Sequence, residues 1–584
     1  MNDLKTTNGL TRELIRKQPE QAREIFDGLP LAERAELVMS RRGRDRLDLI
    51  LLSVETGELV QALPAPEFWI TLKEVDEEDV VELLKLATPD QLLHLSDVEW
   101  WHQGAIDPLP AAYWLMLLAD AGPETCQAWF NRADEELLIA AFSRFFRVFK
   151  IDPDNEGYEP WRNLPNLWTL DGVWFLQFFD PHVATVIERF LSQLRTVEEM
   201  RYYALLDLVE LSVQTEQEDE AYRFRNARLA DFGFVEFDEA MEIYRPISDS
   251  ELAKMRLKQA GSPGFAPPRF PLALVEAPPL LARALALLSD QAAYEAFALG
   301  LASLVSRILV ADSLDLARLE SLTEAAAKAQ SFIELGLRRL GGDDEESAAR
   351  ALVELHPFAL FRAGYSRVTE LARRTEGLLR AGWPARVKLP RGFLAEDGEM
   401  LQGLTRPRPQ FYAGADAEGS PVFREFKSAG DVERAGRAVA RVETLGLLFF
   451  EAMAWPEGEI ERLAECRPDG EVSWRTALAT AAAQAFAGND FRFAPLTAAD
   501  ARVALENMLT PERPRALRPD VVAAFSARAR AGLERLAAAG PAAVEQGAEL
   551  VVEALEKTAE EARELDLTGL DPRFFASLVI VSGA

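Results

Sequence analysis

The sequence predicts an all-α protein in which short stacked helices, arranged as a superhelix or an irregular bundle, precede a second helical part. Two observations support this prediction: prolines repeatedly open short apolar segments in the first part, and Ala/Leu-rich helical patterns fill the last part. Proline suits the first turn of a helix because its missing N–H would have no partner there. A third observation predicts one small β-hairpin at residues 167–178, where Asp171-Gly172 lies between β-favouring residues.

The helices expected in residues 10–150 follow from local start signals. Leu29-Pro30, Leu63-Pro64 and Thr88-Pro89 each precede an apolar segment, which is typical of a helix start. Ser96-Asp97-Val98-Glu99 has the pattern of a capping box, so we expect another helix to start just before Trp100. Loose repetition of this kind indicates helix pairs that stack on one another.

Further along the chain, residues 151–165 are rich in Pro, Asn, Asp and Gly and predict a loop ahead of the hairpin. Helices are expected at about 181–213 and 216–231. Seven prolines lie in residues 246–279, where they remove backbone donors and disfavour helix.

These patterns divide the chain into an N-terminal helical domain (1–245), the Pro-rich linker (246–279) and a C-terminal Ala-rich helical domain (280–584). Within the last domain, residues 382–422 lack helical periodicity and carry several Pro and Gly, so we expect one long loop there.

Composition restricts the classes of partner. The 584 residues include 95 Asp and Glu against 64 Lys and Arg, a net charge of -31, so phosphate-rich nucleic acids and anionic membranes would be repelled. Only two cysteines are present, which fits a reducing compartment. No apolar run reaches the roughly 18 residues that span a bilayer. We therefore expect a cytoplasmic protein with no membrane insertion and no bound nucleic acid.

Catalytic signatures are missing from the sequence. It contains no phosphate-binding glycine loop, no His-Glu-x-x-His and no nucleophile elbow, so the balance of evidence leans away from an enzyme. His94 and His102, with Asp97 and Glu99 between them, come nearest to a metal cluster, but ordinary structural roles are favoured for them. Cys126 is expected to be a buried free thiol.

One segment combines acids, arginines and aromatic residues on a predicted helix. Its candidate ligand-binding residues are Glu218, Glu220, Arg223, Arg225 and Arg228. Arginines one turn apart can bind a carboxylate or phosphate bidentately. The competing interpretation, which we favour, is an internal ion-pair network that joins helices.

A second cluster is acidic. Asp76, Glu77 and Asp79 could hold magnesium, because hard cations prefer carboxylate oxygens, and no other cofactor is expected. The competing interpretation is a solvated helix start, where acids favour the positive end of the helix dipole.

Two resemblances extend this reading. Leu63-Pro64-Ala65-Pro66-Glu67 and the acid-led run from Asp76 to Leu84 resemble the intracellular N-terminal superhelical domain of bacterial magnesium transporters, over residues 29–108. That resemblance implies a fold, not magnesium sensing. The chain as a whole resembles a family of uncharacterised bacterial proteins. The segments that carry this second resemblance are Thr169 to Gly172, Glu218 to Tyr244, Leu360 to Leu371 and Asp571 to Phe574.

Together these observations predict a non-catalytic helical scaffold that binds protein partners, with regulation as one role such a scaffold can serve. One alternative is an enzyme or small-anion binder that uses the Arg/Glu cluster at 218–231. Another is a magnesium-responsive module that uses the acids at 76–79.

Overall fold

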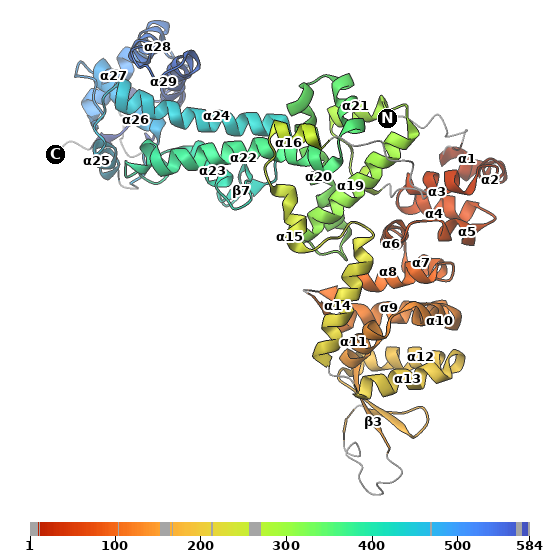
Figure 1. Cartoon of the computed structure of the whole chain (residues 1–584). Coiled ribbons are helices and arrows are strands. Elements are labelled where there is room, and N and C mark those ends of the chain that lie inside the picture. Colours follow the sequence, from red (N-terminus) through yellow and green to blue (C-terminus); the bar gives the residue numbers. More distant parts are fainter. Residues whose placement is uncertain are drawn as a thin grey trace. The chain divides into compact units, whose positions relative to one another are not determined.

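The computed structural model describes residues 10, 12–102, 104–151, 164–165, 167–211, 214–255, 270–467, 470–567 and 575–581. Helices dominate this described part, and the sheets in it are small, with two or three strands each (Figure 1). The predicted all-α class with minor β-hairpins is therefore confirmed. Backbone contacts divide the chain into two compact units, Met1–Gly364 and Tyr365–Ala584, and each is described by itself.

The first unit begins with a stack of short helices that contact their near neighbours along the chain (Figure 1). Proline occupies the first turn of many of them, as the sequence predicts. The helices are α1 (Arg12–Lys17), α2 (Pro19–Asp27), α3 (Leu31–Met39), α4 (Gly43–Leu52), α5 (Thr56–Gln61), α6 (Ala65–Lys73), α7 (Glu77–Leu84), α8 (Pro89–Glu99), α9 (Pro108–Ala121), α10 (Pro123–Arg132), α11 (Glu135–Phe145), α12 (Pro181–Val197) and α13 (Glu199–Leu211).

The predicted helix start at Ser96 is wrong, because Ser96–Glu99 is the last turn of α8. The capping box that opens α8 is formed by Thr88 and Gln91. The Ser96 hydroxyl instead accepts a hydrogen bond from the indole N–H of Trp129, at 2.8 Å. The polar residues Ser96, Asp97 and Glu99 thus do not cap a helix; they are buried and bond to side chains of other helices.

The predicted hairpin at 167–178 is confirmed. Strands β4 (Leu167–Trp168) and β5 (Trp174–Phe178) are antiparallel, and the Asp171 carboxylate accepts hydrogen bonds from the backbone N–H groups of Val173 and Trp174. The sequence reading missed β3 (Phe146–Lys150), which pairs with the other edge of β5 and completes the sheet order β3-β5-β4. The predicted loop at 151–165 lies almost entirely outside the described residues. A further small hairpin joins β1 (Trp101–His102) and β2 (Ala105–Ile106).

The rest of the first unit continues from α14 through several short helices and then into longer ones. Its elements are α14 (Gln214–Ala230), α15 (Phe237–Ala240), η1 (Met241–Tyr244), α16 (Asp249–Lys254), α17 (Phe270–Ala273), α18 (Pro279–Ala286), α19 (Gln291–Ala311), α20 (Leu319–Gly341), α21 (Glu345–Glu354) and the start of α22 (Pro357–Ala381). Within the described part, α19 is the one helix long and apolar enough to cross a membrane by length and composition, and 56% of that apolar stretch is buried inside the structure.

The Pro-rich segment 246–279 does not coincide with the division between the two units, which falls within α22. Residues 256–269 lie outside the described residues, so a linker there stays a prediction. The part that follows is packed: the Phe270 N–H donates to Glu67 of α6, and Gln330 of α20 donates to the Pro271 carbonyl.

The second unit is also helical. Its elements after α22 are η2 (Trp383–Ala385), α23 (Ala395–Leu404), β6 (Phe411–Ala415), β7 (Pro421–Arg424), α24 (Ala429–Gly446), the π-helical turn η3 (Leu447–Ala452), α25 (Glu459–Glu465), α26 (Trp474–Phe486), β8 (Leu496–Thr497), α27 (Ala498–Met508), α28 (Pro519–Leu533), α29 (Pro541–Glu561) and β9 (Ile580–Val581).

The single long loop predicted at 382–422 is wrong. This segment holds a helix, α23, and an antiparallel hairpin of β6 and β7. The hairpin turn is built by Asp416, whose carboxylate accepts the N–H groups of Glu418 and Ser420, and by Gly419, which adopts φ 82°. The Pro and Gly residues that suggested a loop therefore shape turns between short elements.

Candidate functional site

Helix α14 carries all of the sequence-predicted ligand-binding residues, and it presents two different faces. One face is buried, with Ala221, Arg225 and Leu229 turned toward the helical stack. The opposite, solvent-exposed face carries Glu220, Arg223, Phe224 and Ala227. These four residues are called the outer face of α14 below. Within each set, apart from the neighbours Arg223 and Phe224, the residues lie three, four, seven or eight apart, a spacing that keeps their side chains on one side of the helix.

Arg225 and Arg228 both reach Asp97, which is buried in α8. The Arg225 Nε donates to the Asp97 carbonyl at 2.6 Å. Two nitrogens of Arg228 form a bidentate pair with the Asp97 carboxylate, at 2.8 and 2.6 Å, and its third nitrogen donates to Asp134, the N-cap residue of α11. Burial raises the pKa of Asp97 above its usual value, while the hydrogen bonds and positive charge of Arg228 oppose that rise.

Other contacts extend this attachment along α14. The guanidinium of Arg144 in α11 pairs with Glu218 at 2.6 Å. The Arg225 guanidinium lies over the ring of Trp101, 5.4 Å from its centroid, and Tyr222 packs against the same indole. Ion pairs and aromatic contacts thus hold α14 to the stack at successive points.

His94 lies at the edge of this cluster and is fully buried. Its ring contacts Phe232, which follows α14, with 4.8 Å between ring centroids. Burial, together with the positive charge of Arg225, lowers the pKa of His94 to about 3. The side chain is therefore neutral at physiological pH.

The five predicted ligand-binding residues do not converge on one pocket. Arg228 is neutralised by two carboxylates of the protein, and Arg225 is buried against Asp97 and Trp101. Glu218 pairs with Arg144, whereas Glu220 and Arg223 lie on the outer face. This arrangement matches the internal ion-pair interpretation, and it leaves no guanidinium of the buried pair available for an external anion.

Phe224 is the residue on α14 that the sequence reading missed. Its side chain is 47% exposed, and the neighbouring Tyr222 is 38% exposed. Helical spacing does not give this exposure, because Phe224 lies three residues after Ala221 and four residues before Arg228.

The candidate magnesium ligands are dispersed around the start of α7. Asp76 is the exposed N-cap residue, Glu77 accepts a 3.4 Å hydrogen bond from Tyr113, and Asp79 pairs with Arg44 at 3.1 Å. Among the described residues, no group of three or more His, Cys, Asp or Glu side chains is placed to hold a metal ion. Cys126 is buried, and desolvation raises the pKa of its thiol to about 12.

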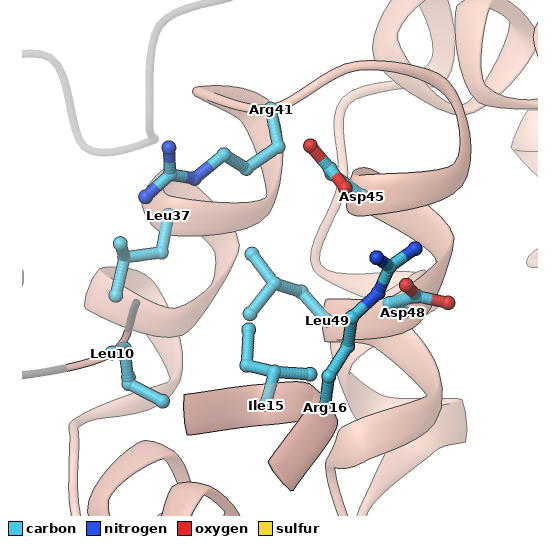
Figure 2. Close-up of a pocket in the computed structure, with 8 residues that line it drawn as sticks. All are labelled: Leu10, Ile15, Arg16, Leu37, Arg41, Asp45, Asp48 and Leu49. Carbon is cyan, nitrogen blue, oxygen red and sulfur yellow. The ribbon is translucent and has the colours of Figure 1, made fainter. Parts of the chain in front are cut away.

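A separate small cavity lies between α1, α3 and α4, close to the start of the described chain (Figure 2). Its volume is about 220 Å³. Aliphatic side chains of Leu10, Ile15, Leu37 and Leu49 line it, and charged side chains surround it. The charged set is Arg16, Arg41, Asp45 and Asp48.

Comparison with known proteins gives one match. The model of a family of unknown function, DUF6178, matches residues 23–581 of the chain. No curated protein and no solved structure matches it. The resemblance of the whole chain to an uncharacterised family is confirmed by this match, while the resemblance of residues 29–108 to a transporter domain stays a prediction.

Proposed function

We propose that this protein, which belongs to the DUF6178 family, is a non-catalytic helical scaffold that binds a protein partner through the outer face of α14. One observation carries the proposal: α14 is fixed to the stack by its buried arginines while it holds Phe224, an aromatic side chain, half exposed on the other side. A partner that covers Phe224 would remove its exposed apolar surface from water, which favours binding.

The composition of the outer face supports a protein as the occupant. Aromatic residues and arginine are enriched at the energetic centres of protein interfaces, and charged residues form the rim. Phe224 has Arg223 beside it and Glu220 one turn away, which reproduces that arrangement on one helix. The net charge of -31 disfavours nucleic acid and anionic membrane as occupants.

The remaining features of the proposal follow the sequence. We propose that the stack is superhelical, as the resemblance of residues 29–108 implies, that the protein is cytoplasmic, and that its binding role is regulatory. The pairing of Arg228 with Asp97 and Asp134 favours the scaffold over the anion-binding alternative. The magnesium alternative stays a prediction, and calorimetric titration with magnesium chloride tests it.

The proposal is tested by affinity purification of the full chain from its native cell. We expect a partner in stoichiometric amount with the wild type, and loss of that partner with Phe224→Asp. Val503→Asp is the matched control, because Val503 in α27 is similarly exposed at 43%. Absence of any stoichiometric partner, or equal retention by Phe224→Asp and the control, would remove the basis of the proposal.

A further inference from the structure

The first unit contains two helical parts, the stack of α1–α13 with α14 attached to it, and a bundle formed by α15 to α21 (Figure 1). Described residues join these two parts at two places. The first lies where the chain leaves α14. There the Phe232 ring packs against His94 of α8, and Ser306 of α19 donates a 2.9 Å hydrogen bond to the Phe232 carbonyl. The second place is the segment from Phe270 to Leu274, which is called the clasp below.

The clasp is part of the bundle. The side chains of Phe270 and Leu274 are buried, and α17 within the clasp contacts α19 and α20. Gln330 of α20, which is itself fully buried, donates a 2.5 Å hydrogen bond to the Pro271 carbonyl. Just beyond the clasp, Glu334 of the same helix accepts the Leu281 N–H at 2.8 Å. Helix α20 therefore holds the clasp in place on the bundle side.

Two side chains of the stack reach the backbone of the clasp. Glu67 of α6 divides its carboxylate, since one oxygen accepts the Phe270 N–H at 2.7 Å and the other accepts from Arg46 of α4 at 3.0 Å. Arg42, the N-cap residue of α4, donates to the Leu274 carbonyl at 3.2 Å. Because Glu67 is inaccessible to solvent, water does not readily replace a partner that its carboxylate loses. These contacts therefore favour the closed clasp.

We propose that the clasp fixes the orientation of the stack relative to the bundle, and that opening it lets the stack turn about the junction at Phe232. An attachment at one place leaves a rigid part free to turn, whereas a second attachment restricts that turning. Hinge motions of this kind are absorbed by a few residues at the ends of elements, which is where Phe232 lies. The proposal does not rest on the function proposed for the outer face of α14.

Distance measurement by pulsed electron spin resonance on the full chain tests the proposal. Spin labels at Glu58→Cys in α5 and Glu346→Cys in α21 report a distance between the stack and the bundle, and both positions are exposed. Cys466→Ser removes the partly accessible native thiol, while Cys126 is buried. We expect one narrow distance distribution for this labelled protein.

Arg42→Ala/Glu67→Gln opens the clasp with little change of shape at the buried position. The glutamine keeps one oxygen for Arg46, but its amide nitrogen is a donor and cannot accept the Phe270 N–H. We expect the distance distribution to widen about twofold, because the stack is then attached at the Phe232 junction alone.

The matched control is Arg44→Ala/Glu82→Gln, which removes the same chemical groups from ion pairs that lie within the stack. Its distance distribution is expected to stay as narrow as that of the labelled parent protein. Hydrogen exchange of the α4 and α6 amides checks that the stack stays folded when the clasp is opened. A wide distribution in the parent, equal widths for the two double variants, or loss of exchange protection throughout the stack would overturn the proposal.

Discussion

At the scale of single residues, the helical stack is joined by buried polar groups whose partners lie on other helices. Arg46 of α4 pairs with Glu67 of α6 at 3.0 Å, and both side chains are essentially inaccessible to solvent. Glu99 of α8 accepts hydrogen bonds from the indoles of Trp69 and Trp114. Such groups add little net stability, but each one penalises any packing in which its partner is missing.

The Arg228 pair gives a direct test of this view. Arg228→Ala leaves Asp97, an almost fully buried carboxylate, without its bidentate partner. Breaking a buried pair costs about 3–5 kcal/mol, so urea unfolding of the first unit should shift by a large part of that amount. Arg223→Ala on the same helix is the control and is expected to change the free energy of unfolding by less than about 0.5 kcal/mol. Equal shifts would show that the Asp97 pair is not what holds α14.

His94 predicts how stability depends on pH. Its pKa is lowered from 6.5 to about 3 in the folded protein, so below pH 6.5 only the unfolded chain takes up this proton. The His94 contribution is complete above pH 6.5 and is lost as the pH falls, by about 2 kcal/mol between about pH 7.5 and about pH 5. The urea-unfolding free energy of His94→Gln should fall less than that of the wild type over this range. Parallel pH curves for the two proteins would contradict the assignment.

At the scale of elements, the backbones of α20 and α22 approach each other closely at two glycines. A Cβ on Gly336 would overlap the carbonyl oxygen of Leu360, and a Cβ on Gly364 would overlap that of Phe332. Only glycine permits helices to pack at this separation. Both residues belong to the first unit.

Alanine substitutions test that close approach. Gly336→Ala or Gly364→Ala should lower the free energy of unfolding by about 1–3 kcal/mol or more, because the backbones must separate. Gly377→Ala, in the same helix α22 with open space around its Cβ position, should be neutral or stabilise by up to about 1 kcal/mol. Differential scanning calorimetry measures both. A destabilised Gly377→Ala, or a tolerated Gly336→Ala, would contradict the packing described.

The elements that sequence reasoning predicted correctly are those specified locally. Proline in a first helical turn and Asp171-Gly172 in a hairpin act through their own backbone geometry. The incorrect predictions concern residues whose structure depends on contacts with distant parts of the sequence. The Ser96 hydroxyl accepts a hydrogen bond from Trp129 instead of capping a helix, and β3 is a strand because it pairs with β5.

The same distinction between local patterns and distant contacts applies to the candidate site. Helical spacing alone places Arg225 and Arg228 on one side of α14, and the internal ion-pair interpretation followed from their residue types. Their shared partner, Asp97, lies 128 and 131 residues away, so no local pattern identifies it. The exposure of Phe224 is seen only in the structure, because its spacing from Ala221 and Arg228 does not distinguish it from the buried side.

At the scale of the whole molecule, the acidity is carried by surfaces and not by the junctions between helices. Inside the first unit, the buried carboxylates described above are matched by arginines or indole N–H groups. The excess of Asp and Glu therefore accumulates at positions where water solvates it. A net charge far from zero opposes self-association through mutual repulsion.

The most direct measurement of the central claim is site-specific photocrosslinking in the native cell, with a photoreactive phenylalanine analogue at position 224. The account predicts one adduct of defined mass at Phe224 and none when the analogue stands at Val503. No adduct at position 224, or the same set of adducts at both positions, would contradict the claim that the outer face of α14 binds a protein partner.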